Sequence, residues 1–201
     1  MRAVTAPTDE ELLRDYLAGN AGSFELLVRR HSQELFQFVM RFTGDSALAE
    51  DVVQESFLQV HTSADRFDPK RRFKPWLFTI AANKARDYLR KRGRRKEVGF
   101  DAHLGDDEAG SQRFIHLLSG EVPAPEEELQ TDERRRLVKQ IVDDMPPNLR
   151  EVLTLAYFHR FPYKEIGDIL EIPLGTVKSR LHAAVAWFGE RYREALTERA
   201  Q

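Results

Sequence analysis

Residues 163–185 read YKEIGDILEIPLGTVKSRLHAAV, and this stretch predicts two short helices joined by a tight turn. The apolar positions of the first helix share one side: Ile166, Ile169 and Leu170. Glu171–Pro173 is too short and too polar to continue that helix, so it forms the turn. The inward positions of the second helix are spaced by four residues: Val177, Leu181 and Val185. Because Gly167 lacks a side chain that would push the helices apart, the pattern predicts a helix-turn-helix.

The remaining side chains of the second helix suit a nucleic-acid groove. They are Thr176, Lys178, Ser179, Arg180, His182 and Ala183. A helix in the major groove of DNA needs long donors and small hydroxyls, because these reach base edges and phosphates. The alternative is an ordinary helical hairpin with a solvated polar face. The glycine, the short turn and the absence of acids over 172–188 favour duplex DNA binding.

Charge is distributed unevenly along the 201 residues. The formal net charge is only −2, from 31 basic and 33 acidic residues. Residues 70–96 hold twelve basic residues and one acid, Asp87, whereas residues 101–133 hold ten acids and one base, Arg113. The acidic stretch also contains glycines and prolines with little apolar periodicity, so we expect a linker of about 30 residues there. We therefore expect two domains, 8–96 and 134–196, joined by an acidic linker over 97–133.

Both expected domains are helical, because apolar residues recur at steps of three and four and no segment alternates with period two. The first domain is expected to contain helices from an Asp9 N-cap to Leu17, from Ser23 to Phe42, over 47–61 and over 76–92. The 47–61 helix has these apolar positions: Leu48, Val52, Val53, Phe57, Leu58 and Val60. The second domain is expected to contain helices over 133–145, 147–157, from Pro162, and over 174–196. The fold class is therefore all-α, with the helix-turn-helix in the C-terminal domain.

An aromatic run, Phe73–Phe78, leads directly into the basic helix that ends in RKRGRRK. Cations bind the phosphate backbone, and aromatic rings among cations stack on unpaired bases, so the combination favours single-stranded or melting DNA. The spacing of Trp76, Phe78 and Ile80 is also that of core positions, and we favour the core for these three. The basic tail has a second interpretation as a solvated run of charges.

Several classes of protein are excluded by composition. Cysteine is absent, which excludes disulfide scaffolds, thiol nucleophiles and thiolate zinc sites and suits a cytoplasmic protein. No apolar run approaches the roughly 18 residues of a membrane span, and the N-terminal residues lack a signal-peptide core, so we expect no membrane insertion. The six histidines are scattered, without an HExxH motif or a glycine-rich phosphate loop. We expect no catalytic site, no metal and no cofactor.

Three blocks, in order, give the chain a resemblance to bacterial RNA polymerase sigma factors of the extracytoplasmic-function group. They are AEDVVQESFLQV at 49–60, DRFDPKRRFKPWLFTIAANKARDYLRKRGRR at 65–95, and LREVLTLAYFHRFPYKEIGDILEIPLGTVKSRLHAA at 149–184. The resemblance implies a non-catalytic polymerase subunit that selects and opens promoters. In this reading, 8–96 is sigma domain 2 and 134–196 is sigma domain 4.

The resemblance also assigns expected roles to residues. The polymerase-binding surface is implied to be Asp51, Gln54 and Glu55, which lie on one helical face opposite Val52, Val53 and Phe57. Contacts to the minus-10 element are implied for Lys70, Arg71, Arg72, Phe73, Lys74, Asn83, Lys84, Arg86 and Arg90. Contacts to the minus-35 element are implied for Thr176, Lys178, Ser179, Arg180 and His182. Ala183, where relatives often have Arg, removes one DNA contact.

The implied partners are core RNA polymerase, through the clamp helices of its largest subunit and the flap of the second largest, promoter DNA in duplex and melted form, and an anti-sigma factor. The main alternative is a helix-turn-helix regulator that acts without polymerase, and the other alternative is an enzyme such as a nuclease. The first alternative gives the Asp51/Gln54/Glu55 face no purpose. The role of the apolar segment Phe114–Leu118, the inducing signal and the promoter sequence stay open.

Overall fold

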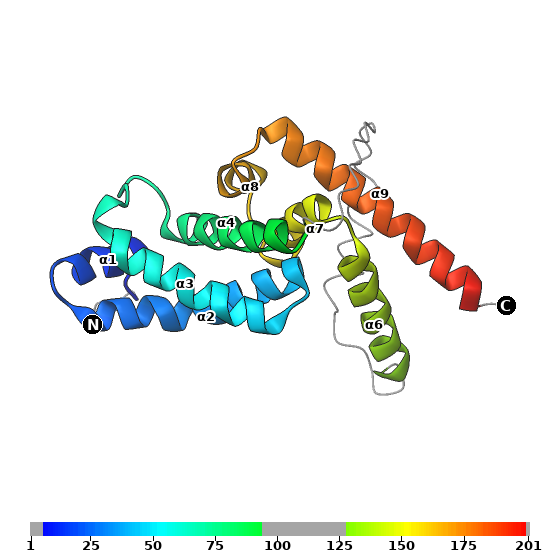
Figure 1. Cartoon of the computed structure of the whole chain (residues 1–201), viewed down its shortest axis with the longest axis horizontal. Coiled ribbons are helices and arrows are strands. Elements are labelled where there is room, and N and C mark those ends of the chain that lie inside the picture. Colours follow the sequence, from blue (N-terminus) through cyan, green and yellow to red (C-terminus); the bar gives the residue numbers. More distant parts are fainter. Residues whose placement is uncertain (1–5, 94–127, 200–201) are drawn as a thin grey trace, which may run out of the picture. The chain divides into compact units, whose positions relative to one another are not determined.

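The computed structural model describes residues 6–93 and 128–199, and every regular element in those ranges is helical (Figure 1). The chain divides into two compact units, one containing α1 to α4 and the other containing α6, α7, most of α8 and α9. This confirms the expected all-α class. Most of the expected acidic linker, including Phe114–Leu118, lies outside the described residues, as do Arg94–Lys96 of the basic tail. Within the described residues, no helix combines the length and apolarity needed to cross a bilayer.

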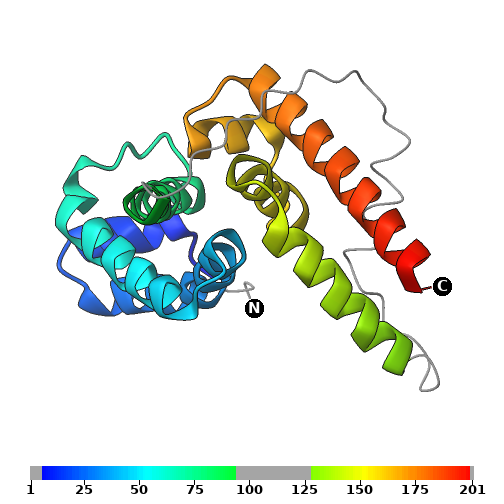
Figure 2. The same ribbon diagram turned by 45° about the vertical axis from the view of Figure 1, so that its right-hand side comes forward.

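The first unit is built from α1 (Asp9–Leu17), α2 (Ala21–Thr43), α3 (Ser46–Ser63), the short 3₁₀ turn η1 (Ala64–Arg66) and α4 (Phe73–Gly93). Helices α2, α3 and α4 pack against one another, and α1 packs on α2 (Figures 1 and 2). The fully buried side chains between them are largely aromatic or aliphatic: Leu27, Leu35, Phe38, Phe42, Val60, Phe73, Leu77 and Phe78. Three-residue and four-residue spacing brings these side chains to one core.

Caps determine where these helices begin and end. The N-cap of α1 is Thr8 rather than the expected Asp9, because Thr8 and Glu11 form a reciprocal capping box. Helix α2 begins at Ala21 after the Asn20 N-cap, so Ser23 lies inside its first turn and is buried. Gly44 ends α2 in the left-handed region with φ 72°, a conformation that glycine adopts without strain. Asp45 then caps α3.

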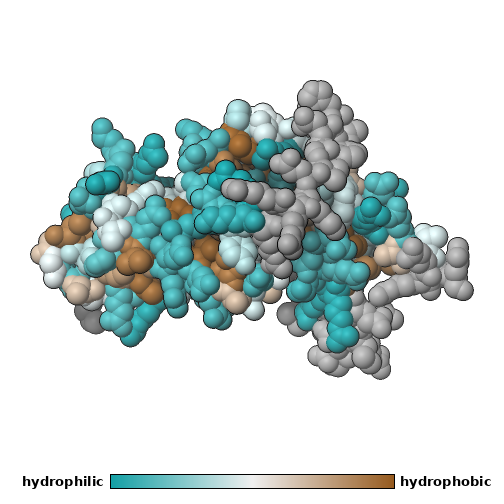
Figure 3. All heavy atoms as spheres, viewed as in Figure 1, coloured by the Kyte–Doolittle hydropathy of each residue, from teal (hydrophilic) through white to brown (hydrophobic). Residues whose placement is uncertain are grey.

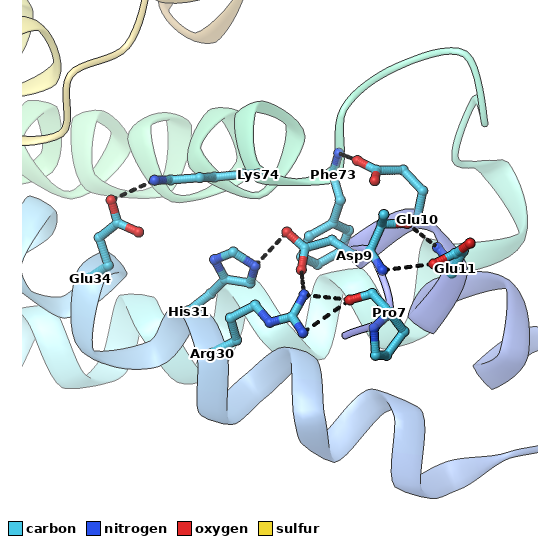
Figure 4. A network of polar contacts seen from close by, with 10 residues as sticks. Pro7, Asp9, Glu10, Glu11, Arg30, His31, Glu34, Phe73 and Lys74 are labelled. Carbon is cyan, nitrogen blue, oxygen red and sulfur yellow. Dashed lines mark hydrogen bonds and ion pairs between the residues drawn. The ribbon is translucent and has the colours of Figure 1, made fainter. Parts of the chain in front are cut away.

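A network of polar contacts holds the first turn of α1 against α2 (Figure 4). The Asp9 carboxylate is 2.5 Å from Arg30 Nη1 and 2.8 Å from His31 Nε2. Arg30 also donates to the carbonyl of Pro7, at 3.1 Å from both terminal nitrogens. Burial opposes ionisation of Asp9, but the hydrogen bonds and charges of His31 and Arg30 outweigh it and hold the pKa of Asp9 below its usual value.

This depressed pKa predicts a specific loss of stability in acid. A carboxyl whose pKa is lower in the folded state stabilises the fold above its unfolded value of about 4, and the contribution is lost as pH falls through the folded pKa. We expect Asp9→Asn to lower the urea midpoint at pH 7 and the difference from the parent protein to shrink steadily below about pH 4. Urea titrations between pH 2.5 and 7 measure this, and a constant difference at every pH would contradict it.

The second unit contains α6 (Glu128–Asp144), α7 (Pro147–Leu153), a π-helical turn η3 (Thr154–Phe158), α8 (Tyr163–Leu170) and α9 (Leu174–Arg199). Both α6 and α7 pack on α9 (Figure 2). Helix α6 begins within the stretch expected to be linker, and the helix expected over 147–157 changes to π geometry at Thr154. The C-terminal helices otherwise lie where the sequence predicts them.

Candidate nucleic-acid interface

Helices α8 and α9 form the expected helix-turn-helix. Helix α8 ends at Leu170, and its C-cap, Glu171, adopts the left-handed conformation with φ 56°. The Ile172 N–H donates to the Gly167 carbonyl at 3.0 Å. The Val177 N–H donates to the Pro173 carbonyl at 3.1 Å and so closes the first turn of α9. A Cβ on Gly167 would lie 3.0 Å from the Ile172 carbonyl oxygen, so the glycine permits this tight turn. Its closest neighbour is the turn itself rather than the second helix.

Helix α9 presents a polar face and a buried stripe. Its buried side chains are Val177, Leu181, Ala184 and Phe188, whereas Val185, expected in the stripe, is only half-buried. Lys178 and Ser179 are exposed, and Thr176, Arg180, His182 and Ala183 are half-buried. The Ser179 hydroxyl donates to the Thr176 carbonyl at 3.2 Å. Of the expected minus-35 residues, Lys178 and Ser179 are therefore the two whose side chains are exposed.

Arg180 is held by a partner that the sequence pattern did not reveal. Its guanidinium lies 3.3 Å from the Glu151 carboxylate of α7, and the side chains are 29% and 5% exposed. Arg150, which precedes Glu151 in the sequence, donates to the Asp143 carbonyl at 2.8 Å. Burial lowers the pKa of Arg150, although the charges of Asp143 and Asp144 oppose this shift. The signal available in the sequence was a pair of charged residues, Arg150 and Glu151, beside the apolar run of α7. The Glu151–Arg180 pair joins α7 to α9, and the Arg150–Asp143 hydrogen bond joins α7 to α6.

In the first unit, the loop between η1 and α4 carries exposed cations. Asp68 makes the turn: its carbonyl accepts from the Arg71 N–H and its carboxylate accepts from the Lys70 N–H, both at 2.9 Å. The side chains of Lys70, Arg71 and Arg72 are exposed. We name residues Phe67–Arg72 the basic loop. Its chemistry suits phosphates and bases in unpaired DNA.

Phe73 occupies the core instead of the proposed DNA surface. Its side chain is 0% exposed, and its ring packs against His31, Phe67 and Trp76, with centroid distances of 5.6, 6.4 and 6.1 Å. A ring without exposed surface cannot stack on a base, so the assignment of Phe73 to the minus-10 contacts is corrected. Phe78 and Ile80 are buried as expected, while Trp76 is half-buried against Phe67 at 4.9 Å.

The other proposed minus-10 residues of α4 make contacts within the first unit. Lys74 Nζ lies 2.6 Å from Glu34 of α2, and Arg86 donates to the Asn83 side chain at 3.2 Å. Arg90 pairs with Asp87 on the surface of the same helix. Lys84 Nζ lies 3.1 Å from Glu55, so one proposed DNA residue contacts one proposed polymerase residue. The residues proposed to bind polymerase on α3 therefore lie beside the residues proposed to bind DNA on α4.

The outward face of α3 is acidic with an apolar edge. Asp51, Gln54 and Glu55 are exposed, opposite the buried Val52, Ser56 and Phe57. Leu58, expected in the apolar pattern of the core, is 61% exposed one turn beyond Gln54 and Glu55. Hydrophobic side chains interrupt the hydrophilic surface of the first unit in the space-filling view (Figure 3). We name Asp51, Gln54, Glu55 and Leu58 the α3 face.

Comparison with known proteins identifies the family of this chain. Sigma-70 region 2 matches residues 27–95, and Sigma-70, region 4 matches residues 135–188. RNA polymerase sigma-H factor of Pseudomonas aeruginosa is 31% identical over 90% of this chain and 92% of its own. ECF RNA polymerase sigma-E factor of Haemophilus influenzae is 32% identical over 88% of this chain and 91% of its own. The chain belongs to the extracytoplasmic-function sigma factors.

Solved structures show the same fold as this sigma factor. CnrH, in complex with the cytosolic domain of CnrY, matches with a TM-score of 0.63 and 24% identity over 92% of this chain and 97% of its own. RpoE of Bartonella quintana, in complex with the anti-sigma factor NepR, matches with a TM-score of 0.61 and 22% identity over 85% and 96%. As a sigma factor, the protein functions in transcription initiation. Its described residues contain no group of three metal-ligating side chains.

Proposed function

We propose that this sigma factor binds core RNA polymerase through the α3 face, reads the minus-35 element with α9 and opens the minus-10 element with α4 and the basic loop. The observation that carries the proposal is the chemistry of the exposed side chains on each matched region. Region 2 exposes an acidic face at Asp51, Gln54 and Glu55 and three cations at Lys70, Arg71 and Arg72. Region 4 exposes Lys178 and Ser179 on the second helix of a helix-turn-helix.

The proposed contacts differ in their physical role. On α9, Lys178, Ser179 and His182 reach base edges in the major groove, and Thr176 contacts a phosphate. Arg180 contacts a phosphate with the part of its guanidinium that Glu151 leaves accessible, since its side chain is 29% exposed. On region 2, Asn83 reads a flipped base, and Lys74, Lys84, Arg86 and Arg90 hold strand phosphates together with the basic loop. The protein adds no catalytic group of its own.

Reconstitution with core polymerase tests the proposal. The purified chain is expected to co-purify with core polymerase and to direct initiation from a discrete set of start sites in a random promoter library. The alternative, a regulator that acts without polymerase, predicts duplex DNA binding together with failure of both assays. That result would overturn the proposed function.

The α3 face supplies a prediction of its own. Asp51→Ala with Gln54→Ala removes two exposed side chains and leaves the Glu55–Lys84 pair intact. We expect the Kd for core polymerase to rise about tenfold, which corresponds to about 1.4 kcal/mol. Fluorescence anisotropy of labelled protein measures the Kd, and Glu25→Ala on α2, which removes an exposed carboxylate paired with Arg29, is the matched control. An unchanged Kd in the double variant would remove the α3 face from the interface.

We further propose an anti-sigma factor as a regulatory partner. Large apolar side chains of the first unit are exposed at Leu17, Leu26 and Leu58, and a protein surface that buries them would be favoured by the hydrophobic effect. The related folds CnrH and RpoE were solved with such proteins bound. We place the protein in the cytoplasm, where a subunit of the transcription machinery acts.

A further inference from the structure

We propose that Glu10 on α1 is a positioning residue for promoter recognition: it caps the N-terminus of α4 and so fixes where the basic loop presents its cations. The inference rests on the proposed role of the basic loop at the minus-10 element. It concerns a residue on α1, a helix that lies outside the matched region 2.

The N-terminus of α4 lacks an acid of its own. Its first turn contains no acidic residue and includes Lys74, although a helix N-terminus favours negative charge. The Glu10 carboxylate, 63 residues away in sequence, accepts a hydrogen bond from the Phe73 N–H at 2.8 Å. Glu10 therefore supplies both the acceptor and the negative charge that the first turn of α4 does not provide.

Glu10 is itself held in place by contacts on both sides of it in the sequence (Figure 4). Thr8 and Glu11, on either side of it, form the capping box of α1. The Thr8 N–H donates to the Glu11 carboxylate at 2.8 Å, and the Glu11 N–H donates to the Thr8 hydroxyl oxygen at 3.2 Å. Next to it, Asp9 binds Arg30 and His31 of α2. The first turn of α1 is thus fixed on α2, and the Glu10 carboxylate is directed at the start of α4.

The basic loop lies between two anchors, and Glu10 contacts the second of them. At its start, the Phe67 ring packs on Trp76 at a centroid distance of 4.9 Å. At its end, the loop is followed by Phe73, whose ring is buried and whose N–H donates a hydrogen bond to the Glu10 carboxylate. Between these anchors lie Asp68, which makes the turn, and three exposed cations. Sites that read bases need supporting contacts that hold them within about 0.5 Å, so loss of the Glu10 contact at one anchor would loosen the loop.

A purely structural role for Glu10 makes a different prediction from a positioning role. If Glu10 only stabilised the fold, its loss would reduce the amount of active protein and would lower transcription from every promoter by the same factor. If Glu10 positions the basic loop, its loss changes the ratio between promoters that differ only in the minus-10 element. That ratio does not depend on how much folded protein is present.

The experiment measures this ratio with reconstituted holoenzyme. A promoter selected from a random library by the parent holoenzyme is compared with versions carrying single changes in the minus-10 element, and open complexes are quantified by permanganate reactivity. We expect Glu10→Ala to reduce the discrimination about tenfold or more, the effect expected for loss of a hydrogen bond to a charged group. Glu10→Gln retains an acceptor oxygen and is expected to restore most of the discrimination.

Two matched controls accompany these variants. Tyr16→Phe removes the hydrogen bond to His61 at the other end of α1, and Glu25→Ala removes an exposed carboxylate of α2; both are expected to keep the parent ratio. Parent discrimination in Glu10→Ala would overturn the inference while leaving the proposed function intact, and a Glu10→Gln variant that behaves like Glu10→Ala would overturn the hydrogen-bond assignment. A parent protein that directs no specific initiation would overturn both the proposed function and the inference.

Discussion

A Phe73→Ala variant is expected to lose about 3–5 kcal/mol of unfolding free energy, the cost of removing a large aromatic side chain from a packed core. Phe73 is fully buried, and its ring contacts His31, Phe67 and Trp76 from three separate parts of the first unit. The substitution therefore leaves a cavity where α2, α4 and the basic loop meet. Since single domains are stable by only about 5–15 kcal/mol, this loss would remove a large fraction of the stability of the first unit.

Tryptophan fluorescence in urea measures this loss. The chain has two tryptophans, and a Trp187→Phe background leaves Trp76, which lies beside Phe73, as the only reporter. Tyr88→Ala, an exposed aromatic on the same helix, is the matched control and is expected to change the free energy of unfolding by no more than about 0.5 kcal/mol. If Phe73→Ala kept the stability of the parent and lost only promoter opening, the ring would belong to the DNA surface after all.

The second large effect is expected for Lys178→Ala, which should cost about 1–3 kcal/mol of discrimination at one position of the minus-35 element, or roughly 5- to 150-fold. Lys178 is exposed on α9, adjacent to Ser179 and clear of the buried stripe formed by Val177, Leu181 and Ala184. In the proposed function, Lys178 donates to guanine acceptors in the major groove. Promoter selection with the variant holoenzyme is expected to relax the preference at that base pair alone.

The salt dependence of binding separates a base contact from a phosphate contact. A lysine that binds a phosphate would instead weaken all sequences equally and reduce the slope of log K against log salt by about one. Lys139→Ala on α6, an exposed lysine paired with Asp143, is the matched control and is expected to keep the parent preference. A uniform loss with a reduced slope in Lys178→Ala would reassign Lys178 to the backbone.

Periodicity alone was sufficient for much of the architecture. Steps of three and four predicted the helices of both units, and the short polar segment Glu171–Pro173 predicted the turn that the structure contains. Ends were less predictable: Thr8 rather than Asp9 caps α1, because either side chain can accept hydrogen bonds and only the capping box with Glu11 decides between them. Leu58 is exposed and Val185 is only half-buried, although both fit the apolar pattern of their helices. The three- and four-residue spacing places a residue near the edge of an apolar stripe but does not determine whether another helix covers it.

The candidate surfaces were predictable where exposure follows from the helix face, as it does for Asp51, Gln54, Lys178 and Ser179. Pairings between distant residues were not predictable, because no local pattern records them. Glu151 binds Arg180 across 29 residues, and Lys84 binds Glu55 across the same separation in the other unit. These ion pairs depend on how α7 packs on α9 and α3 on α4.

Three properties follow from the sequence alone: the chain is helical, its charge is segregated, and the helix-turn-helix of its C-terminal domain suits DNA. Each depends on residues that lie close together along the chain. Only the packed helices show which aromatic side chains are buried in the core and which charged side chains form ion pairs with distant residues. Phe73 is the clearest case: its neighbours in sequence are cations, yet its neighbours in space are His31, Phe67, Trp76 and the carboxylate of Glu10. Burial is a property of the assembled helices, so it can be read only after α1, α2 and α4 have packed.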